Sequence, residues 1–433
     1  MPGSFDVVVL GAGAAGLMAA IRAAELGRSI CLVEKNRRPG VKILMSGGTR
    51  CNLTNARGLR NLSVISGPID PLYDPREAQG ARSIQAAFGE NGKFLGPSLR
   101  SLSVEDSVRF FELEGVPTKV EGNGKIFPVS DRATDVLNAL LGRLERSGAT
   151  LRTESAAGEV RSVEEGFAVG LPDGPILAKR VVLATGGLSF PGSGTTGDGY
   201  AMARGFGHSI VPTRPSLVPL RVGPEWVTSL KGLTIPDLLA TVRRRSGAKL
   251  DERREALLFA HFGLTGPAVL DVSRAVARWD QAEPLDLALD WLPDSRAEAL
   301  ELEIQNEARR GGKGVVSLIP ATIPRRLAEA IVRESKIPTD RIGPDLSRDE
   351  RKRLVGNLKG LILPITGTLG FAKAEVTSGG VSLDEVDPKT LESRLQPGLH
   401  LIGEVLDLDG RIGGYNFQGA WSMGWLAGEA VCR

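Results

Sequence analysis

A glycine pattern near the N-terminus constrains the fold most strongly. The short apolar run from Val7 to Leu10 is followed by a Gly-x-Gly-x-x-Gly spacing and an alanine-rich stretch that ends at Gly27. Buried parallel strands have this apolar, β-branched composition. The three glycines permit a tight turn, close approach of a pyrophosphate, and close packing of the following helix. We therefore predict a dinucleotide-binding strand, turn and helix. The residues expected at the pyrophosphate are Gly11, Gly13, Ala14, Ala15 and Gly16.

An acidic residue completes this N-terminal motif. A second apolar run, from Ser29 to Val33, ends in Glu34. A carboxylate at the end of the second strand accepts hydrogen bonds from ribose hydroxyls and repels a 2′-phosphate, so NADP is disfavoured. A ligand-free turn would explain the glycines but not the acid at this position. These residues leave NAD and FAD as alternatives.

The segment after Glu34 is polar and rich in glycine. It offers hydrogen-bond donors on Lys42, Arg50, Asn52 and Asn55, and exposed backbone at Ser46, Gly47 and Gly48. Such a segment is unsuited to a core strand, and its residue types are those of a loop that wraps a polar ligand. We predict a ligand-binding loop here.

A second group of candidate site residues lies near the C-terminus. The predicted strand from Gly398 to Ile402 ends in Gly403 and Glu404, and an acid there can meet the other part of a long dinucleotide. Gly413 then precedes a helix rich in Ala, Gly and Trp. The positive end of that helix suits an electron-rich flavin carbonyl. A glycine-rich turn before a packed helix is the alternative interpretation.

The middle of the chain follows different patterns. Short alternating runs from Leu217 to about Leu292 indicate an antiparallel sheet or small barrel, and the stretch after Ser295 is helical with many charges. We therefore predict an α/β protein with a discontinuous, Rossmann-like dinucleotide domain. Its expected parts are residues 1–190 and 365–433, interrupted by a β-rich lobe at 191–294 and a helical lobe at 295–364.

Composition sets further limits. A chain of 433 residues, 42% hydrophobic, can form two or three domains with their own cores. The net charge of +3 gives no indication of a nucleic-acid partner, and no stretch reaches the length of a membrane span. Three cysteines provide neither a disulfide framework nor a metal site. The first strand starts too early for a signal peptide, so we expect a cytoplasmic protein of undetermined oligomeric state.

Taken together, the motifs resemble those of one family nearly from end to end. The chain is similar to the BaiN/YhiN-type NAD(P)/FAD-dependent oxidoreductases, which include enzymes labelled aminoacetone oxidase. The family usually has three glycines before Arg-Cys-Asn, whereas Thr49 stands at the third position here. The motifs that carry the resemblance are Gly11–Gly16, Ser46–Asn55, Phe127–Ser130, Ala184–Gly187, Ser189–Pro191, Gly197–Tyr200, His261–Pro267, Val376–Val381 and Gly403–Gln418.

The resemblance implies non-covalent FAD in a split two-dinucleotide-type domain. It places Glu34 and Lys35 at the adenosine, with backbone near Ala157 at the adenine, and Thr185 and Gly186 at the cofactor. The residues implied on the isoalloxazine and ribityl side are Lys42, Gly47, Gly48, Arg50, Cys51 and Asn52. Those implied to complete the flavin end are Glu404, Asp409, Gly414, Tyr415, Asn416 and Phe417.

The expected activity is hydride transfer through flavin N5 to a small or steroid-like organic substrate, with NAD(P)H as a transient co-substrate. One alternative is an amine oxidase that uses oxygen. An alternative of another class is a flavoprotein that binds or senses a partner such as RNA, which the small net charge disfavours. His261 is the candidate proton-transfer residue, although a structural role is more common for such a histidine. We expect Cys51 to be a buried, inert thiol and Tyr415 to serve packing or a backbone hydrogen bond.

Overall fold

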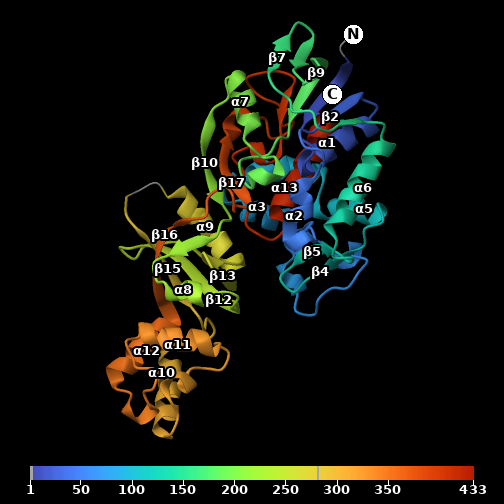
Figure 1. Ribbon diagram of the computed structural model, residues 1–433. Coiled ribbons are helices and arrows are strands. Elements are labelled where there is room, and N and C mark those ends of the chain that lie inside the picture. Colours follow the sequence, from blue (N-terminus) through green and yellow to red (C-terminus); the bar gives the residue numbers. More distant parts are fainter. Residues whose placement is uncertain (1–2, 280–281) are drawn as a thin grey trace. The chain divides into compact units, whose positions relative to one another are not determined.

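The computed structural model describes residues 3–279 and 282–433, which form two compact units (Figure 1). Unit 1 comprises Met1–Arg214 and Val376–Arg433, and unit 2 comprises Pro215–Glu375. The two segments that join the units contain β10 (Ile210–Ser216) and β17 (Val376–Val381), which pair in a two-stranded sheet. The chain therefore leaves unit 1 later than residue 190 and returns later than residue 365, because α7 (Asp198–Gly205) and these paired strands belong with the N-terminal part.

Unit 1 is built on a mixed, mostly parallel sheet with β1 (Ser4–Leu10) near its centre. β2 (Ile30–Val33) pairs with one edge of β1 and β9 (Ile176–Leu183) with the other, and all three strands are parallel. β1 is buried over its second half, which explains its uninterrupted run of valines. The remaining strands of this sheet are β6 (Thr150–Arg152) beside β2, and β7 (Val160–Val163), β8 (Gly166–Val169) and β18 (Leu399–Leu401) beyond β9.

Strand β9 joins the N-terminal and C-terminal parts of unit 1. Its first half pairs with β8, which is antiparallel, and its second half pairs with β18, which is parallel. The carboxyl ends of β1, β2, β9 and β18 therefore lie at one edge of the sheet. This is the edge at which open α/β sheets bind their ligands.

Two helices far apart in sequence pack against each other beside this sheet. They are α1 (Ala14–Glu25) and α13 (Tyr415–Ala430) (Figure 1). A Cβ atom at Gly424 would lie 2.4 Å from the Ala15 carbonyl oxygen, and one at Gly428 would lie 2.8 Å from the Ala19 carbonyl oxygen. The contact therefore requires glycine on α13, since any side chain would push the helices apart.

Further elements of unit 1 follow β2 in the chain. The strands β3 (Thr54–Asn55), β5 (Lys125–Pro128) and β4 (Thr118–Val120) form a small antiparallel sheet. Helix α2 (Val41–Thr49) packs near α6 (Ala133–Arg146), and a Ser103 capping box begins α5 (Val104–Leu113). Two short helices, α3 (Ala81–Ala87) and α4 (Gly96–Ser101), lie between β3 and α5 in the sequence.

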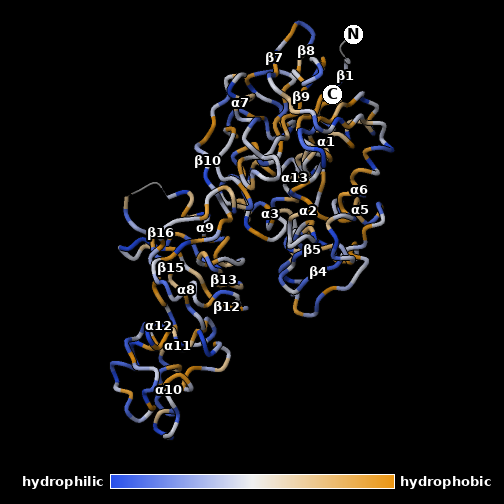
Figure 2. The backbone as a smooth tube through the Cα atoms, viewed as in Figure 1, coloured by the Kyte–Doolittle hydropathy of each residue, from blue (hydrophilic) through white to orange (hydrophobic). Residues whose placement is uncertain are grey.

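Unit 2 combines a closed barrel with helices around one shared hydrophobic core. The barrel order is β11 (Leu220–Val222), β14 (Gly263–Thr265), β13 (Lys249–Ala260), β12 (Thr234–Arg244), β15 (Leu285–Asp290) and β16 (Leu361–Thr368). Its helices are α8 (Trp226–Ser229), α9 (Pro267–Arg278), α10 (Ala297–Arg309), α11 (Arg325–Glu334) and α12 (Arg348–Gly360). Helices α10 to α12 show hydrophobic and hydrophilic stretches in alternation, as expected of helices that cover a core (Figure 2). None of the described helices is long and apolar enough to span a membrane.

The polar segment after β2 differs in part from the predicted loop. It starts as helix α2, becomes non-helical at Ser46, and then turns left-handed at Gly47, Gly48 and Thr49, with φ of 56°, 68° and 70°. Left-handed backbone strains a β-branched side chain, and glycine relieves this strain. The turn itself explains why three consecutive glycines suit this position.

We predict that Thr49→Gly raises the free energy of unfolding by about 1 kcal/mol, because it relieves the left-handed strain at an exposed position. Denaturant unfolding of the two proteins measures the difference. The matched control is Thr150→Gly in strand β6, also exposed, where the same change should destabilise the protein. Equal destabilisation at both positions would contradict the strain argument.

Candidate cofactor site

The N-terminal glycine turn has the geometry expected of a pyrophosphate site. Gly11 has φ of 103°, and a Cβ atom there would lie 2.5 Å from the Ala184 carbonyl oxygen. A Cβ at Gly16 would lie 1.9 Å from the Gly11 carbonyl oxygen, whereas one at Gly13 would meet no atom within 4 Å. No side chain caps α1 at Gly13. The first turn of α1 therefore presents backbone N–H groups toward open space, as anion sites at helix N-termini do.

Glu34 follows directly on β2 and is nearly buried. One carboxylate oxygen accepts the Ala12 N–H at 2.9 Å and the other accepts the Asn36 N–H at 2.9 Å. The Ser155 N–H donates to the Glu34 carbonyl, which brings the loop containing half-buried Ala157 beside this strand end. Both oxygens retain lone pairs for ribose hydroxyls. The structure thus brings together the two elements expected at the adenosine.

Lys35 connects this strand end with the glycine-rich segment before α7. Its ammonium lies 2.5 Å from both the Thr196 hydroxyl and an Asp198 carboxylate oxygen. The adjacent Asn36 amide donates to the Ser193 carbonyl at 3.0 Å. These contacts hold the segment beside the predicted adenosine position. Thr185, at the end of β9, has a buried hydroxyl without a hydrogen-bond partner among the described residues.

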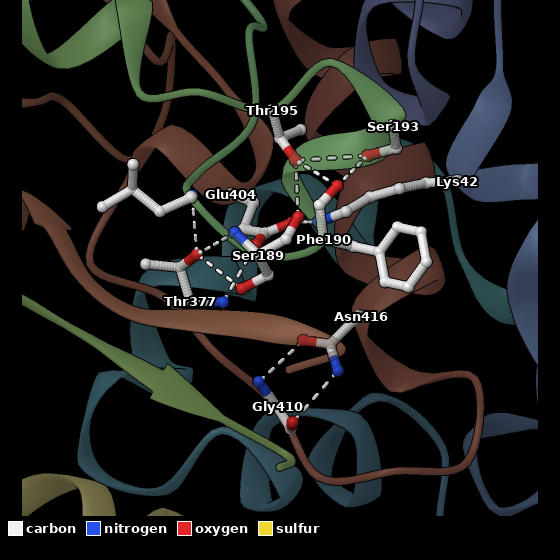
Figure 3. A network of polar contacts seen from close by, with 10 residues as sticks. Lys42, Ser189, Phe190, Ser193, Thr195, Thr377, Glu404, Gly410 and Asn416 are labelled. Carbon is white, nitrogen blue, oxygen red and sulfur yellow. Dashed lines mark hydrogen bonds and ion pairs between the residues drawn. The ribbon is translucent and has the colours of Figure 1, made fainter. Parts of the chain in front are cut away.

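A polar network joins the two halves of unit 1 at the carboxyl edge of the sheet (Figure 3). Glu404 accepts the Thr377 N–H at 2.9 Å through one oxygen and pairs with Lys42 Nζ at 2.6 Å through the other. The Thr377 hydroxyl in turn accepts the Leu188 and Ser189 N–H groups at 2.9 and 3.1 Å. Lys42 and Glu404 were expected at the site. The two motifs that contain Thr377 and Ser189 carry part of the family resemblance, but the sequence predicted no function for either residue.

The left-handed turn and the start of α13 are linked through two asparagines. The Asn52 amide, in the orientation that satisfies its neighbours, accepts the Gly414 N–H at 2.9 Å and donates to the Thr54 carbonyl. The Asn55 amide donates to the Gly413 carbonyl at 2.9 Å. A Cβ atom at Gly414 would lie 2.4 Å from the Thr54 carbonyl oxygen. These contacts bring the two predicted flavin-binding elements together.

Arg50 and Cys51 lie beside the left-handed turn. The Arg50 guanidinium stacks 3.9 Å from the centre of the Phe127 ring and pairs with Glu121 at 2.5 Å. Cys51 is fully buried with φ of 61°. Burial raises the pKa of its thiol to about 12, despite a hydrogen bond with Ser46 that acts in the opposite direction. Cys51 is therefore buried and protonated at neutral pH, as expected of an inert thiol.

The residues at and before the start of α13 have different structural contacts. The Asn416 amide holds the preceding loop through the Gly410 N–H at 2.7 Å and the Gly410 carbonyl at 3.0 Å (Figure 3). The Phe417 ring stacks on Trp421 with centroids 5.3 Å apart. Asp409 is buried, and Gly403 lies next to Ala15. The Asn416 side chain is therefore used to hold the loop, so any cofactor contact at this residue would involve its backbone.

His261 lies in unit 2, in the turn between β13 and β14. It is exposed and forms an edge-to-face contact with the neighbouring Phe262 ring. Its catalytic role stays a prediction. No group of three acidic, histidine or cysteine side chains among the described residues has the geometry of a metal site.

The features of unit 1 fit FAD. The open space at Gly13, the uncapped start of α1 and the unpartnered Thr185 hydroxyl suit a pyrophosphate and its ribose. The left-handed turn and the start of α13, which the Asn52 amide joins, offer further backbone N–H groups. Glu34 after β2, the start of α1 and Gly403 after β18 would hold successive parts of a dinucleotide, because the strand order places these strand ends along one sheet edge.

Comparisons with known proteins agree with this architecture. The family model described as HI0933-like protein Rossmann domain matches residues 5–66 and 77–430. Ribosomal RNA dihydrouridine synthase of Escherichia coli K12 is 33% identical over 428 residues, with 98% of this chain and 97% of the relative covered. The 3-dehydro-bile acid delta(4,6)-reductase of Clostridium scindens is 30% identical over 429 residues, covering 98% of each chain.

A solved structure supports the fold. The 3-ketosteroid-delta4-(5alpha)-dehydrogenase of Rhodococcus jostii RHA1 superposes with a TM-score of 0.55 at 15% identity, covering 100% of this chain and 97% of that one. The fold and the family match together define an FAD-dependent oxidoreductase with a Rossmann-like cofactor domain. The chain belongs to the HI0933-like family. The expected fold class, FAD as the cofactor and the enzyme class are confirmed, whereas NAD(P)H as co-substrate stays a prediction.

We predict that Glu34→Gln weakens FAD binding about tenfold, because the amide NH₂ would face one of two backbone N–H donors and the ribose would lose a charged acceptor. Titration of apoprotein with FAD, followed by flavin fluorescence, measures the dissociation constant. Glu164→Gln in the exposed turn between β7 and β8 is the control and should bind FAD as the wild type does. An unchanged constant in Glu34→Gln would contradict this assignment.

We also predict that Cys51 resists alkylation in the folded protein at pH 8, because its thiol is buried and its pKa is about 12. Mass spectrometry after iodoacetamide treatment identifies the labelled residues. Cys432, which is partly exposed, should be labelled first, and unfolded protein should be labelled at Cys51 as well. Rapid labelling of Cys51 in folded protein would show a reactive thiol instead.

Proposed function

We propose that the protein is an FAD-dependent reductase of carbon–carbon double bonds conjugated to a carbonyl group, with NADH or NADPH as electron donor. The supporting observation is that two full-length relatives have named activities that share this chemistry. A uracil ring carries a double bond conjugated to a ring carbonyl, and its reduction yields dihydrouridine. A 3-dehydro steroid with delta-4,6 double bonds carries the same conjugated group.

The residues of unit 1 have roles consistent with this proposal. The turn from Gly11 to Gly16 would hold the pyrophosphate, and Glu34 would hold the adenosine ribose. The left-handed turn at Gly47 and the start of α13 would hold the flavin non-covalently through backbone donors. FAD when bound supplies the hydride at flavin N5. The chain would orient the conjugated carbonyl and deliver a proton to the double-bond carbon next to that carbonyl.

Of the two substrate classes, we favour a uridine in ribosomal RNA. The relative with that named substrate has the higher identity, 33% against 30%. The segment from residue 295 to 364 has fourteen Lys and Arg residues and ten Asp and Glu residues, an excess that suits phosphate contacts. This choice departs from the expectation, based on net charge, that no nucleic acid is a partner. The small or steroid-like substrate is the second candidate.

The test is anaerobic reduction followed by oxidation with candidate substrates. We expect NADH or NADPH to bleach the visible flavin band of the purified protein. An unmodified ribosomal RNA transcript should then restore the band, and mass spectrometry should find dihydrouridine in that RNA. A conjugated 3-keto steroid forms the second arm, and the matching saturated steroid is the control because it has no double bond to reduce.

The outcomes separate the alternatives. Reoxidation by the steroid but not by the RNA would support the reductase and move the substrate to the second candidate. Failure of both nicotinamides, together with reduction by amines and reoxidation by oxygen, would overturn the reductase in favour of the amine oxidase. Bleaching without reoxidation by any conjugated compound would overturn the proposed substrate chemistry.

A further inference from the structure

A cluster of aromatic and charged side chains lies at the start of α13. Arg57 Nε pairs with a Glu77 carboxylate oxygen at 2.8 Å, and its guanidinium forms a hydrogen bond with the Tyr415 phenol. Tyr73 lies near both, and its buried hydroxyl has no hydrogen-bond partner among the described residues. Tyr415 is the first residue of α13 and is itself buried. The cluster therefore places a guanidinium next to the positive end of this helix.

The charge of Arg57 is permanent. Burial alone would lower its pKa, but the hydrogen bonds and charges of Glu77 and Tyr415 outweigh burial and raise the pKa above its usual value. Burial, followed by the charge of Glu77, raises the pKa of the Tyr73 phenol to about 12, so Tyr73 stays neutral. The Glu77 side chain is 42% exposed, against 29% for Arg57. Solvent therefore screens the negative member of the pair more than the positive one.

The backbone of Arg57 is tied to the start of α13, where the flavin is expected. The Asn55 side-chain oxygen accepts the backbone N–H of Arg57 at 3.0 Å. The Asn55 side-chain NH₂ donates to the Gly413 carbonyl, just before α13. The same start of α13 is tied through Gly414 and Asn52 to the left-handed turn. Among the described residues, no side chain caps the first turn of α13 at Gly414. The helix N-terminus and the Arg57 guanidinium thus both place positive charge at the start of α13.

We propose that Arg57 is an electrostatic positioning residue that stabilises negative charge on the pyrimidine half of the flavin and thereby raises the midpoint potential of bound FAD. The inference rests on the proposed function in one respect, namely that the flavin lies between the left-handed turn and α13. Tyr415 transmits the effect because its phenol holds the guanidinium against the helix start. A cation at this position favours the reduced cofactor, which carries negative charge on its pyrimidine ring.

The test compares FAD-loaded Arg57→Gln, Arg57→Lys and Tyr415→Phe proteins with the wild type. Sulfite titration and equilibration with a reference dye are the readouts, since both report the stability of negative charge on the flavin and neither requires substrate turnover. Arg57→Gln should bind sulfite at least about tenfold more weakly and have a more negative midpoint potential. Arg57→Lys should largely retain both properties, and Tyr415→Phe should be intermediate.

Arg76→Gln is the matched control, because Arg76 lies in the same part of the chain but has a 90% exposed side chain paired with Asp74. It should leave sulfite affinity and midpoint potential unchanged. Arg57→Gln with full FAD content and wild-type values for both would overturn the proposal. If Arg57→Gln does not retain FAD, Tyr415→Phe decides, and an unchanged sulfite affinity there would overturn the proposal. If the variants show these shifts but the wild-type protein reduces no conjugated substrate, the proposed function alone would be contradicted.

Discussion

The contact between helices α1 and α13 is the constraint on which unit 1 depends. It joins the first and last helices of the chain and is close enough to require glycine at two positions of α13, Gly424 and Gly428. Because α1 begins at the candidate pyrophosphate turn and α13 begins at the candidate flavin position, their packing would determine how far apart the two ends of a bound dinucleotide lie. Gly403, which lies beside Ala15, extends this close packing to the end of β18.

Polar contacts then fix the loops around this helix pair. Glu404 holds Lys42 of the N-terminal half and the backbone of Thr377 of the C-terminal half. Asn52 and Asn55 hold the start of α13 against β3 and its flanking turn. Each of these interactions joins segments more than 300 residues apart in the sequence, apart from the short-range Thr377 contact. The site is thus a property of the closed unit, since neither half contains a complete set of contacts.

Much of this site was predictable from local pattern. The spacing of Gly11, Gly13 and Gly16, with Glu34 after the next strand, specifies a turn whose chemistry needs no distant residue. Thr377 and Arg57 were not assigned functions, because their roles depend on partners brought near by folding. The domain limits in the structure differ from the predicted ones, because neither segment alone shows that β10 pairs with β17. The burial of Cys51 was expected, but its left-handed backbone was evident only from the structure.

The sequence alone determined the dinucleotide motif, the α/β class and, through its family resemblance, the FAD cofactor. These three conclusions follow from residue types and their spacing over short stretches, and such patterns do not depend on the rest of the fold. Only the tertiary structure decided that Glu404 pairs with Lys42 and that Arg57 reaches the start of α13. The physical reason is that hydrogen bonds and ion pairs depend on distances of a few ångströms, and those distances arise from the packing of α1 against α13 and not from separation along the chain.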